Sequence, residues 1–210
     1  SQKGFMLPAG LAIVGVSPKA IAAMDTATSA RCFFDFRDMI GAYSKGGYPY
    51  TPPVSMITGL SEALEMLLDE GLDAVHARHH RIAEGVRRAV AAWGLDLAAA
   101  DPSLYSDTIS AVRLPEGVDG DAFVKHAAEA YGVAFGIGLG EMAGKIFRIG
   151  HLGSMTDVMA LSGIATAEMV MADMGIAVTP GSGVAAAQDY YRTSRTASAK
   201  TTTIDSKKAA

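Results

Sequence analysis

The chain begins with Ser1-Gln2-Lys3-Gly4-Phe5-Met6-Leu7-Pro8-Ala9-Gly10, and an apolar run, Leu11 to Val16, follows at once. That run predicts a buried strand. A lysine placed just before such a strand can be held at the edge of a sheet and partly desolvated. Desolvation disfavours an ammonium group, and a neutral amine can attack a carbonyl to form a Schiff base. The alternative is a surface lysine in a turn, which is the commoner place for this residue type.

Composition and charge narrow the class of protein. The 210 residues are half hydrophobic, enough for a real core in one or two domains. The net charge is −4, and no basic patch indicates binding to nucleic acid. Cys32 is the one cysteine, so no intrachain disulfide can form and a reducing compartment fits. No stretch resembles a membrane span, and we expect a cytoplasmic protein.

The pattern of apolar residues predicts helices and strands along most of the chain. Ser17-Pro18 is a typical helix start, and apolar residues at helical spacing predict a long helix from Leu60 to Trp93, kinked near Gly71. We expect strands over 108–114, 132–140 and 145–151, and helices over 119–131, 155–174 and 181–195. The Ser/Thr/Lys-rich tail, 196–210, is expected to be mobile.

Tyr48-Pro49-Tyr50-Thr51-Pro52-Pro53 is too rich in proline for a regular helix or a central strand. Hydroxyl groups fixed between prolines donate hydrogen bonds to a phosphate at low entropic cost. The alternative is a loop whose aromatic residues only pack.

Arg148 lies in the apolar segment Phe147-Arg148-Ile149-Gly150-His151-Leu152-Gly153. An arginine in an apolar strand is costly unless it is paired, and its planar fork fits a carboxylate. The pattern leaves two alternatives open for the partner of Arg148: a substrate carboxylate, or an internal Asp or Glu. His151 and His79 are expected to be structural, hydrogen-bonded histidines. His76 and His80 have the spacing of zinc ligands, but Arg78 and Arg81 crowd them and we expect no metal site.

Several segments together resemble one family. Ser1-Gln2-Lys3-Gly4 with Leu7-Pro8-Ala9-Gly10, then Asp107–Val112, Ala143–Gly153 and Pro180–Val184, are similar to class V aminotransferases of the serine–glyoxylate and alanine–glyoxylate group. The resemblance extends to about Arg192. It implies an α/β protein of pyridoxal-phosphate (PLP) fold type I: the end of the large α/β domain in residues 1–60, a long connecting helix in 61–94, and a small C-terminal α+β domain in 95–195.

The resemblance also implies roles for individual residues. Lys3 would hold pyridoxal 5'-phosphate as a Schiff base and then move the proton between the substrate α-carbon and C4′ of the cofactor. Gln2 would lie near the cofactor phosphate or ring, and Ser1 is a further candidate for cofactor binding. The chain begins without a methionine and two residues before Lys3, so we expect a fragment. An aromatic residue and an aspartate that hold the cofactor ring would then belong to a preceding half, and we do not expect the chain alone to bind the cofactor firmly.

Three further residues follow from the same resemblance. Tyr48 and Thr51 would reach the cofactor phosphate of a partner subunit, which implies a homodimer with shared sites and leaves open whether dimers pair into tetramers. Arg148 would clamp the α-carboxylate of the amino acid and then of the oxo acid.

The expected reaction is transamination from an L-amino acid, L-serine in the first place, to glyoxylate. L-aspartate is the second candidate for the donor, and L-alanine is a further alternative. An aspartate donor would need a second cationic group, which the sequence does not identify; Arg31 and Arg37 are the residues whose proximity should be checked. Two alternatives remain: a PLP lyase or decarboxylase on the same fold, and a domain kept only for dimerisation. Cys32 is badly placed for the catalytic cysteine of a desulfurase.

Overall fold

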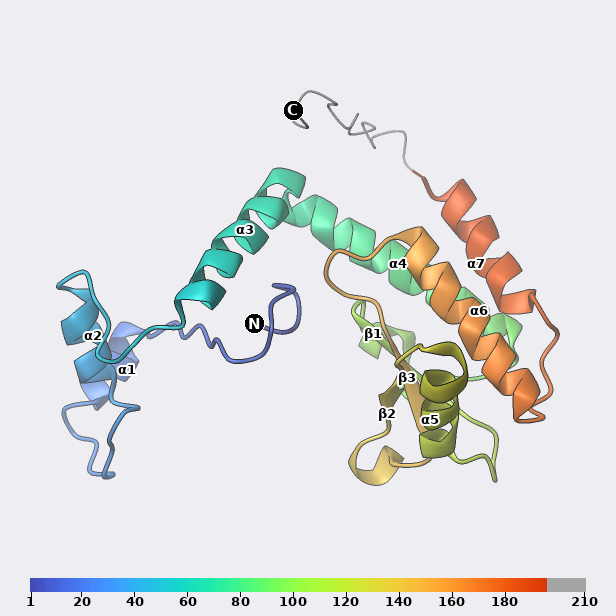
Figure 1. The fold of residues 1–210 in the computed structure, drawn as a ribbon, viewed down its shortest axis with the longest axis horizontal. Helices are drawn as coiled ribbons and strands as arrows, with labels where there is room; N and C mark the ends of the chain where they lie inside the picture. The colour runs from blue at the N-terminus through green and yellow to red at the C-terminus, as the bar shows by residue number, and fades with distance from the viewer. Residues whose placement is uncertain (196–210) are drawn as a thin grey trace. The chain divides into compact units, whose positions relative to one another are not determined.

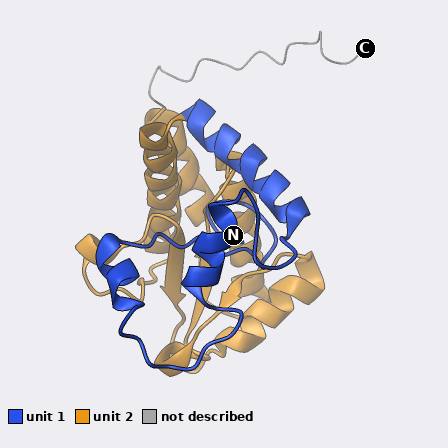
Figure 2. Cartoon of the chain, turned by 90° about the vertical axis from the view of Figure 1, so that its left-hand side faces the viewer, with its two compact units in different colours: residues 1–70 blue, residues 71–210 orange. Residues whose placement is uncertain are grey.

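The structure, a computed structural model, describes residues 1–195 and divides the chain into two compact units. The first is Ser1–Glu70 and the second begins at Gly71 (Figure 2). The tail expected over 196–210 lies outside the described residues. No described helix is both long enough and apolar enough to cross a membrane.

The first unit holds three helices, α1 (Pro18–Ala23), α2 (Phe36–Tyr43) and α3 (Val54–Glu70) (Figure 1). The helix start predicted at Ser17-Pro18 is confirmed, because the Ser17 side chain accepts a hydrogen bond from the Ala20 N–H and Pro18 opens the helix. Asp35 caps α2 in the same way through the Arg37 N–H.

The prediction of a buried strand over 11–16 is wrong. These residues form no strand, and Ile13 and Val14 are each 61% exposed. A strand needs a neighbouring strand to take its backbone hydrogen bonds, and no strand forms anywhere in residues 1–70. The apolar pattern indicates side chains that should be buried, and only a neighbouring strand could bury them.

The second unit is built from α4 (Leu72–Ala92), β1 (Ile109–Arg113), α5 (Gly120–Tyr131), β2 (Gly136–Ile137), β3 (Ile146–Gly150), α6 (Asp157–Asp173) and α7 (Ser182–Thr193). Short 3-10 turns, η1 (Pro102–Leu104) and η2 (Gly140–Met142), connect some of them. The strands form an antiparallel sheet in the order β1-β3-β2, with α5 beside it (Figure 1). The predicted order of strand, helix, two strands and helix is confirmed.

The long helix expected from Leu60 to Trp93 is two helices that meet at Gly71. Gly71 has a φ of 83°, a left-handed conformation that glycine adopts without strain. The α-helical hydrogen bonds therefore stop at Glu70 and begin again at Leu72. The kink predicted at this glycine is confirmed as a complete break.

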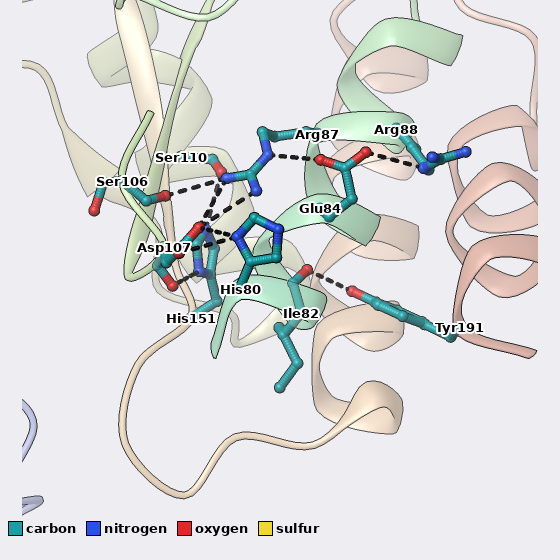
Figure 3. A network of polar contacts seen from close by, with 10 residues as sticks. All are labelled: His80, Ile82, Glu84, Arg87, Arg88, Ser106, Asp107, Ser110, His151 and Tyr191. Carbon is teal, nitrogen blue, oxygen red and sulfur yellow. Dashed lines mark hydrogen bonds and ion pairs between the residues drawn. The ribbon is translucent and has the colours of Figure 1, made fainter. Parts of the chain in front are cut away.

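The core of the second unit lies between α4, α6, α7 and the sheet. Its fully buried side chains include Ile82, Val86, Val112, Phe123, Phe147, Ile164 and Met171. Gly85 lets α4 and α7 approach closely, because a Cβ there would overlap the Tyr191 ring. The Tyr191 hydroxyl donates a hydrogen bond to the Ile82 carbonyl, 2.8 Å away (Figure 3).

A buried carboxylate joins α4, α6 and the start of α7. Glu168, only 7% exposed, accepts hydrogen bonds from Trp93 Nε1 at 2.9 Å, Gly181 N at 2.9 Å and Gly183 N at 2.6 Å. The backbone donors are free N–H groups at the N-terminus of α7, where a negative charge is favourable. Glu168, on α6, therefore satisfies donors at the ends of two other helices, α4 and α7.

Replacing Glu168 with alanine is expected to lower the free energy of unfolding by about 3 kcal/mol, because buried donors on Trp93 and Gly183 lose their acceptor. Glu129→Ala is the matched control, since the Glu129 side chain is 67% exposed on α5. That change should cost no more than about 0.5 kcal/mol. Urea unfolding of both variants measures the difference, and equal midpoints would contradict a structural role for the Glu168 carboxylate.

Candidate active site

Lys3 lies in a tight turn that closes the first eleven residues into a loop. The Lys3 carbonyl accepts the Met6 N–H at 2.9 Å, and Met6 has a φ of 58°. The Ser1 hydroxyl donates to the Pro8 carbonyl at 2.7 Å and accepts the Leu11 N–H at 3.2 Å. The Ser1 side chain thus holds the loop closed. Lys3 therefore lies in a turn, which was the alternative in the sequence analysis, and the expected sheet edge does not form.

The loop rests on α3 through small contacts. A Cβ at Gly59 of α3 would lie 2.8 Å from the end of the Leu7 side chain, and one at Gly10 would lie 3.3 Å from Met56 Sδ. Gln2 and Lys3 are both exposed, and the Gln2 side-chain oxygen accepts a hydrogen bond from the Ser1 amine. Within residues 1–195, no hydrogen bond or ion pair engages the Lys3 amine.

Tyr48 and Thr51 lie in the irregular loop between α2 and α3, where the prolines predicted an absence of helix and strand. Both are exposed, and neither hydroxyl has a hydrogen-bond partner in the described part of the chain. Tyr48 lines a hollow together with Lys45 and Arg37. Tyr50 instead packs on Phe33 with ring centroids 4.6 Å apart.

Arg31 and Arg37 share one carboxylate. Arg37 Nη2 lies 2.8 Å from Asp35 Oδ2, and Arg31 Nε lies 3.1 Å from the same oxygen. The hydrogen bonds from Arg37 hold the pKa of Asp35 well below its usual value. Both guanidinium groups that could have received a second substrate carboxylate are therefore already paired with Asp35.

Arg148 lies at the centre of the sheet, on β3, with its neighbours Phe147 and Ile149 in the core. Its Nε donates a hydrogen bond of 2.7 Å to the Ile137 carbonyl on β2. No Asp or Glu among residues 1–195 forms an ion pair with Arg148, so the internal ion pair that the sequence left open does not occur there. Its two terminal nitrogens, Nη1 and Nη2, have no partner in the same residues. A planar fork in this state suits a carboxylate from outside the unit.

A polar network fixes the end of β3 (Figure 3). His151 is fully buried, with Nδ1 3.2 Å from the Asp107 carbonyl and Nε2 2.9 Å from the Ser110 hydroxyl. A carbonyl can only accept, so Nδ1 carries the proton and Nε2 accepts from Ser110. The Asp107 carboxylate in turn accepts from Arg87 and lies 3.1 Å from His80 Nδ1. The prediction that His151 is a hydrogen-bonded structural residue is confirmed.

A second histidine holds the segment that follows. His79 on α4 donates from Nδ1 to the Val75 carbonyl at 2.7 Å and accepts the Gly153 N–H at Nε2, 3.0 Å away. The predicted interior, hydrogen-bonded His79 is confirmed. The sequence pattern did not reveal Asp107 as the centre of the network, because its partners come from α4 and from the residue that follows β3, far apart in the chain.

The burial of His151 predicts a pH dependence of stability. Burial lowers its pKa from 6.5 to about 4. Between these values the unfolded chain binds a proton that the folded chain does not. Stability should therefore fall as the pH drops from 6.5 toward 4, by up to about 1.4 kcal/mol per pH unit. His151→Gln should flatten this slope in urea unfolding at several pH values, whereas the exposed His76→Gln should keep it. A slope unchanged by His151→Gln would contradict the assignment.

The predicted site residues fall into both units. Ser1, Gln2, Lys3, Tyr48 and Thr51 belong to Ser1–Glu70, and Arg148 belongs to the second unit. Among the described residues, no hydrogen bond joins Lys3 to Tyr48 or Thr51. The first unit thus carries an amine and hydroxyl groups, and the second carries a guanidinium group.

Comparison with curated proteins gives relatives over almost the whole chain. An L-aspartate–glyoxylate aminotransferase of Paracoccus denitrificans is 64% identical over 200 residues, which are 95% of this chain and 50% of the relative. A serine–glyoxylate aminotransferase of Hyphomicrobium methylovorum is 48% identical over 212 residues, covering 100% of this chain and 52% of the relative. The chain spans about half the length of the curated relatives it matches. No family model matches it.

Solved structures show the same relationship. The pyridoxamine-pyruvate aminotransferase of Mesorhizobium loti aligns with a TM-score of 0.80 at 37% identity, over 86% of this chain and 47% of that one. The ureidoglycine-glyoxylate aminotransferase of Bacillus subtilis aligns with a TM-score of 0.85 at 25% identity, over 91% and 50%. The fold class expected from the sequence, PLP fold type I, is confirmed.

Proposed function

Because this chain belongs to the class V aminotransferase family, whose cofactor is pyridoxal 5'-phosphate, we propose that its holoenzyme transfers an amino group from an L-amino acid to glyoxylate. The products are glycine and a 2-oxo acid. The holoenzyme here means this chain together with any segment encoded ahead of it. The proposal is carried by identities of 64% and 48% to two aminotransferases that are named for glyoxylate.

The geometry of Arg148 supports this reaction. Nη1 and Nη2 are without partners among residues 1–195, while Nε is held by the Ile137 carbonyl. Donor and acceptor both carry a carboxylate beside the reacting carbon. One guanidinium fork can therefore bind each in turn through two parallel hydrogen bonds and orient it in the same way.

The residues of the first unit fit the cofactor. Lys3 presents an amine that no described group engages, on a turn braced by hydrogen bonds. When bound, pyridoxal phosphate supplies an electron sink for charge at the substrate α-carbon. Lys3 would then hold the cofactor and move the proton at that carbon, and Gln2 would lie near the phosphate or ring. The Ser1 hydroxyl, which binds Pro8 and Leu11, supports the loop and is the weaker cofactor ligand.

The hydroxyls of Tyr48 and Thr51 suggest a homodimer. Both are exposed and unpartnered in the described residues, and the side of Tyr48 borders a hollow with Lys45. In the proposed assembly they donate to the cofactor phosphate of the partner subunit, so that two active sites are shared, and dimers could pair further into tetramers. A cytoplasmic location and the division into 1–60, 61–94 and 95–195 remain predictions.

Two observations favour different donors. The higher identity, 64%, is to an enzyme named for L-aspartate, whereas the enzyme named for serine is 48% identical. An aspartate donor needs a cation for its second carboxylate, and Arg31 and Arg37 are both paired with Asp35. The pairing favours L-serine, as the sequence analysis expects. L-aspartate is the second candidate and L-alanine the third.

The visible spectrum of the holoenzyme loaded with pyridoxal phosphate tests the proposal. L-serine, L-aspartate and L-alanine are added in separate cuvettes, and glyoxylate is then added to each. Loss of the band of the lysine-bound cofactor with one donor, and its return with glyoxylate, would establish the transfer and identify the donor. A band that no donor shifts, or one that glyoxylate never restores, would overturn the proposal in favour of a lyase or a domain without catalysis.

A further inference from the structure

Gly136 provides the surface on which the Arg148 side chain lies. The two residues are direct partners across the antiparallel strands β2 and β3. A Cβ at Gly136 would lie 3.0 Å from Arg148 Nε, 3.2 Å from its Cβ and 3.3 Å from its Cζ. Arg148 therefore lies across the glycine, and any larger residue would push it away.

The backbone of Gly136 does not itself require glycine. Gly136 is not among the residues with a positive φ, so alanine can adopt its conformation without strain. The three nearest atoms that a Cβ would meet all belong to Arg148. The space taken by this one side chain is thus the physical reason for glycine at this position.

The next residue along β2 sets the direction of the guanidinium. The Ile137 carbonyl accepts a hydrogen bond of 2.7 Å from Arg148 Nε. A guanidinium can hold a carboxylate either through Nε and one terminal nitrogen or through both terminal nitrogens. Because Ile137 occupies Nε, only the pair Nη1 and Nη2 remains for two parallel hydrogen bonds.

We infer that Gly136 is a positioning residue for the substrate carboxylate: together with the Ile137 carbonyl it seats Arg148 so that both terminal nitrogens face a carboxylate end-on. The inference rests on the proposed function, because Arg148 is taken to bind the α-carboxylate. Gly136 touches no substrate and acts only through Arg148. Its effect is therefore on the affinity for the carboxylate and not on the reacting carbon.

Gly136→Ala in the holoenzyme tests this inference, with Gly150→Ala as the matched control. Gly150 is in β3 of the same sheet, and a Cβ there meets nothing within 4 Å. The first readout is the dissociation constant of glycolate, a carboxylate that cannot accept an amino group, measured by titration calorimetry. The second is the division of the effect between KM and kcat for glyoxylate, and the third is a double-mutant cycle with Arg148→Lys.

We expect Gly136→Ala to weaken glycolate binding and raise KM for glyoxylate by about tenfold, since one of two charge-assisted hydrogen bonds is misaligned. The value of kcat and the visible band should stay as in the parent, because the change affects binding alone. Gly150→Ala should leave all of these values unchanged. In the Arg148→Lys background, Gly136→Ala should have almost no further effect, since the clash is with the arginine.

The outcomes separate this inference from the proposed function. If Arg148→Lys leaves glycolate affinity unchanged, the proposed role of Arg148 fails and the inference fails with it. If Arg148→Lys weakens binding but Gly136→Ala does not, the function stands and the positioning role is wrong. Equal losses in Gly136→Ala and Gly150→Ala, or additive effects in the cycle, would also overturn it. Should Gly136→Ala fold poorly, recovery of folding in the double variant would support the clash, and no recovery would contradict it.

Discussion

Replacing Lys3 with arginine is expected to slow amino-group transfer by at least about a thousandfold, the range that loss of a positioned proton carrier and nucleophile produces. Arginine keeps the positive charge and the length of the side chain. Its guanidinium stays protonated, so it can neither form a Schiff base nor take a proton near neutral pH. The visible band of the lysine-bound cofactor should disappear with the rate, which a spectrophotometric assay of the half-reaction measures.

The structure provides a matched control for the Lys3→Arg variant. Lys3 is exposed in a turn held by the backbone and by Ser1, so arginine should not disturb folding. Lys19 is also exposed, in the first turn of α1, and Lys19→Arg should keep the full rate and the band. A Lys3→Arg enzyme that turned over at the normal rate would exclude this lysine from the chemistry.

Arg148→Lys should lower kcat/KM by about a hundredfold, because an ammonium cannot replace a planar fork that makes two parallel hydrogen bonds to a carboxylate. The loss should be similar for the amino donor and for glyoxylate, since both carry the same group. Steady-state kinetics with each substrate varied in turn measures the loss in kcat/KM for the donor and for glyoxylate.

Arg113→Lys is the matched control for Arg148. Arg113 lies on β1 of the same sheet, and its guanidinium donates to the Ala98 carbonyl at the surface. Its replacement should change kcat/KM by less than about threefold, as expected for a surface substitution. A loss confined to one substrate in Arg148→Lys would mean that the two half-reactions do not share one clamp.

Local signals in the sequence were sufficient for the start of α1 and for the break after α3. Ser17-Pro18 marked the start of α1, and Gly71 marked the end of α3, because capping and a left-handed φ depend on residues close in the chain. The strand expected over 11–16 failed because strand formation depends on a distant partner. An apolar run indicates which side chains must be buried, but it does not reveal which element packs against them.

The sequence proposes residue types for the candidate site but does not reveal their contacts. The apolar surroundings of Arg148 indicated a guanidinium that requires a carboxylate, and the family resemblance indicated Lys3. The contact of Arg148 with Gly136 and Ile137 depends on the register between β2 and β3, which no local pattern specifies. Glu168 was equally hidden, since its donors come from α4 and from the residues around the start of α7.

The hydrogen bond between Trp93 and Glu168 has a practical consequence for following the folding of this chain. Trp93 is its only tryptophan, is 5% exposed, and donates its indole N–H to the buried carboxylate. Selective excitation of the indole therefore gives an emission signal from one place, where α4 and α6 meet the start of α7. A red shift of that emission would report water reaching this junction.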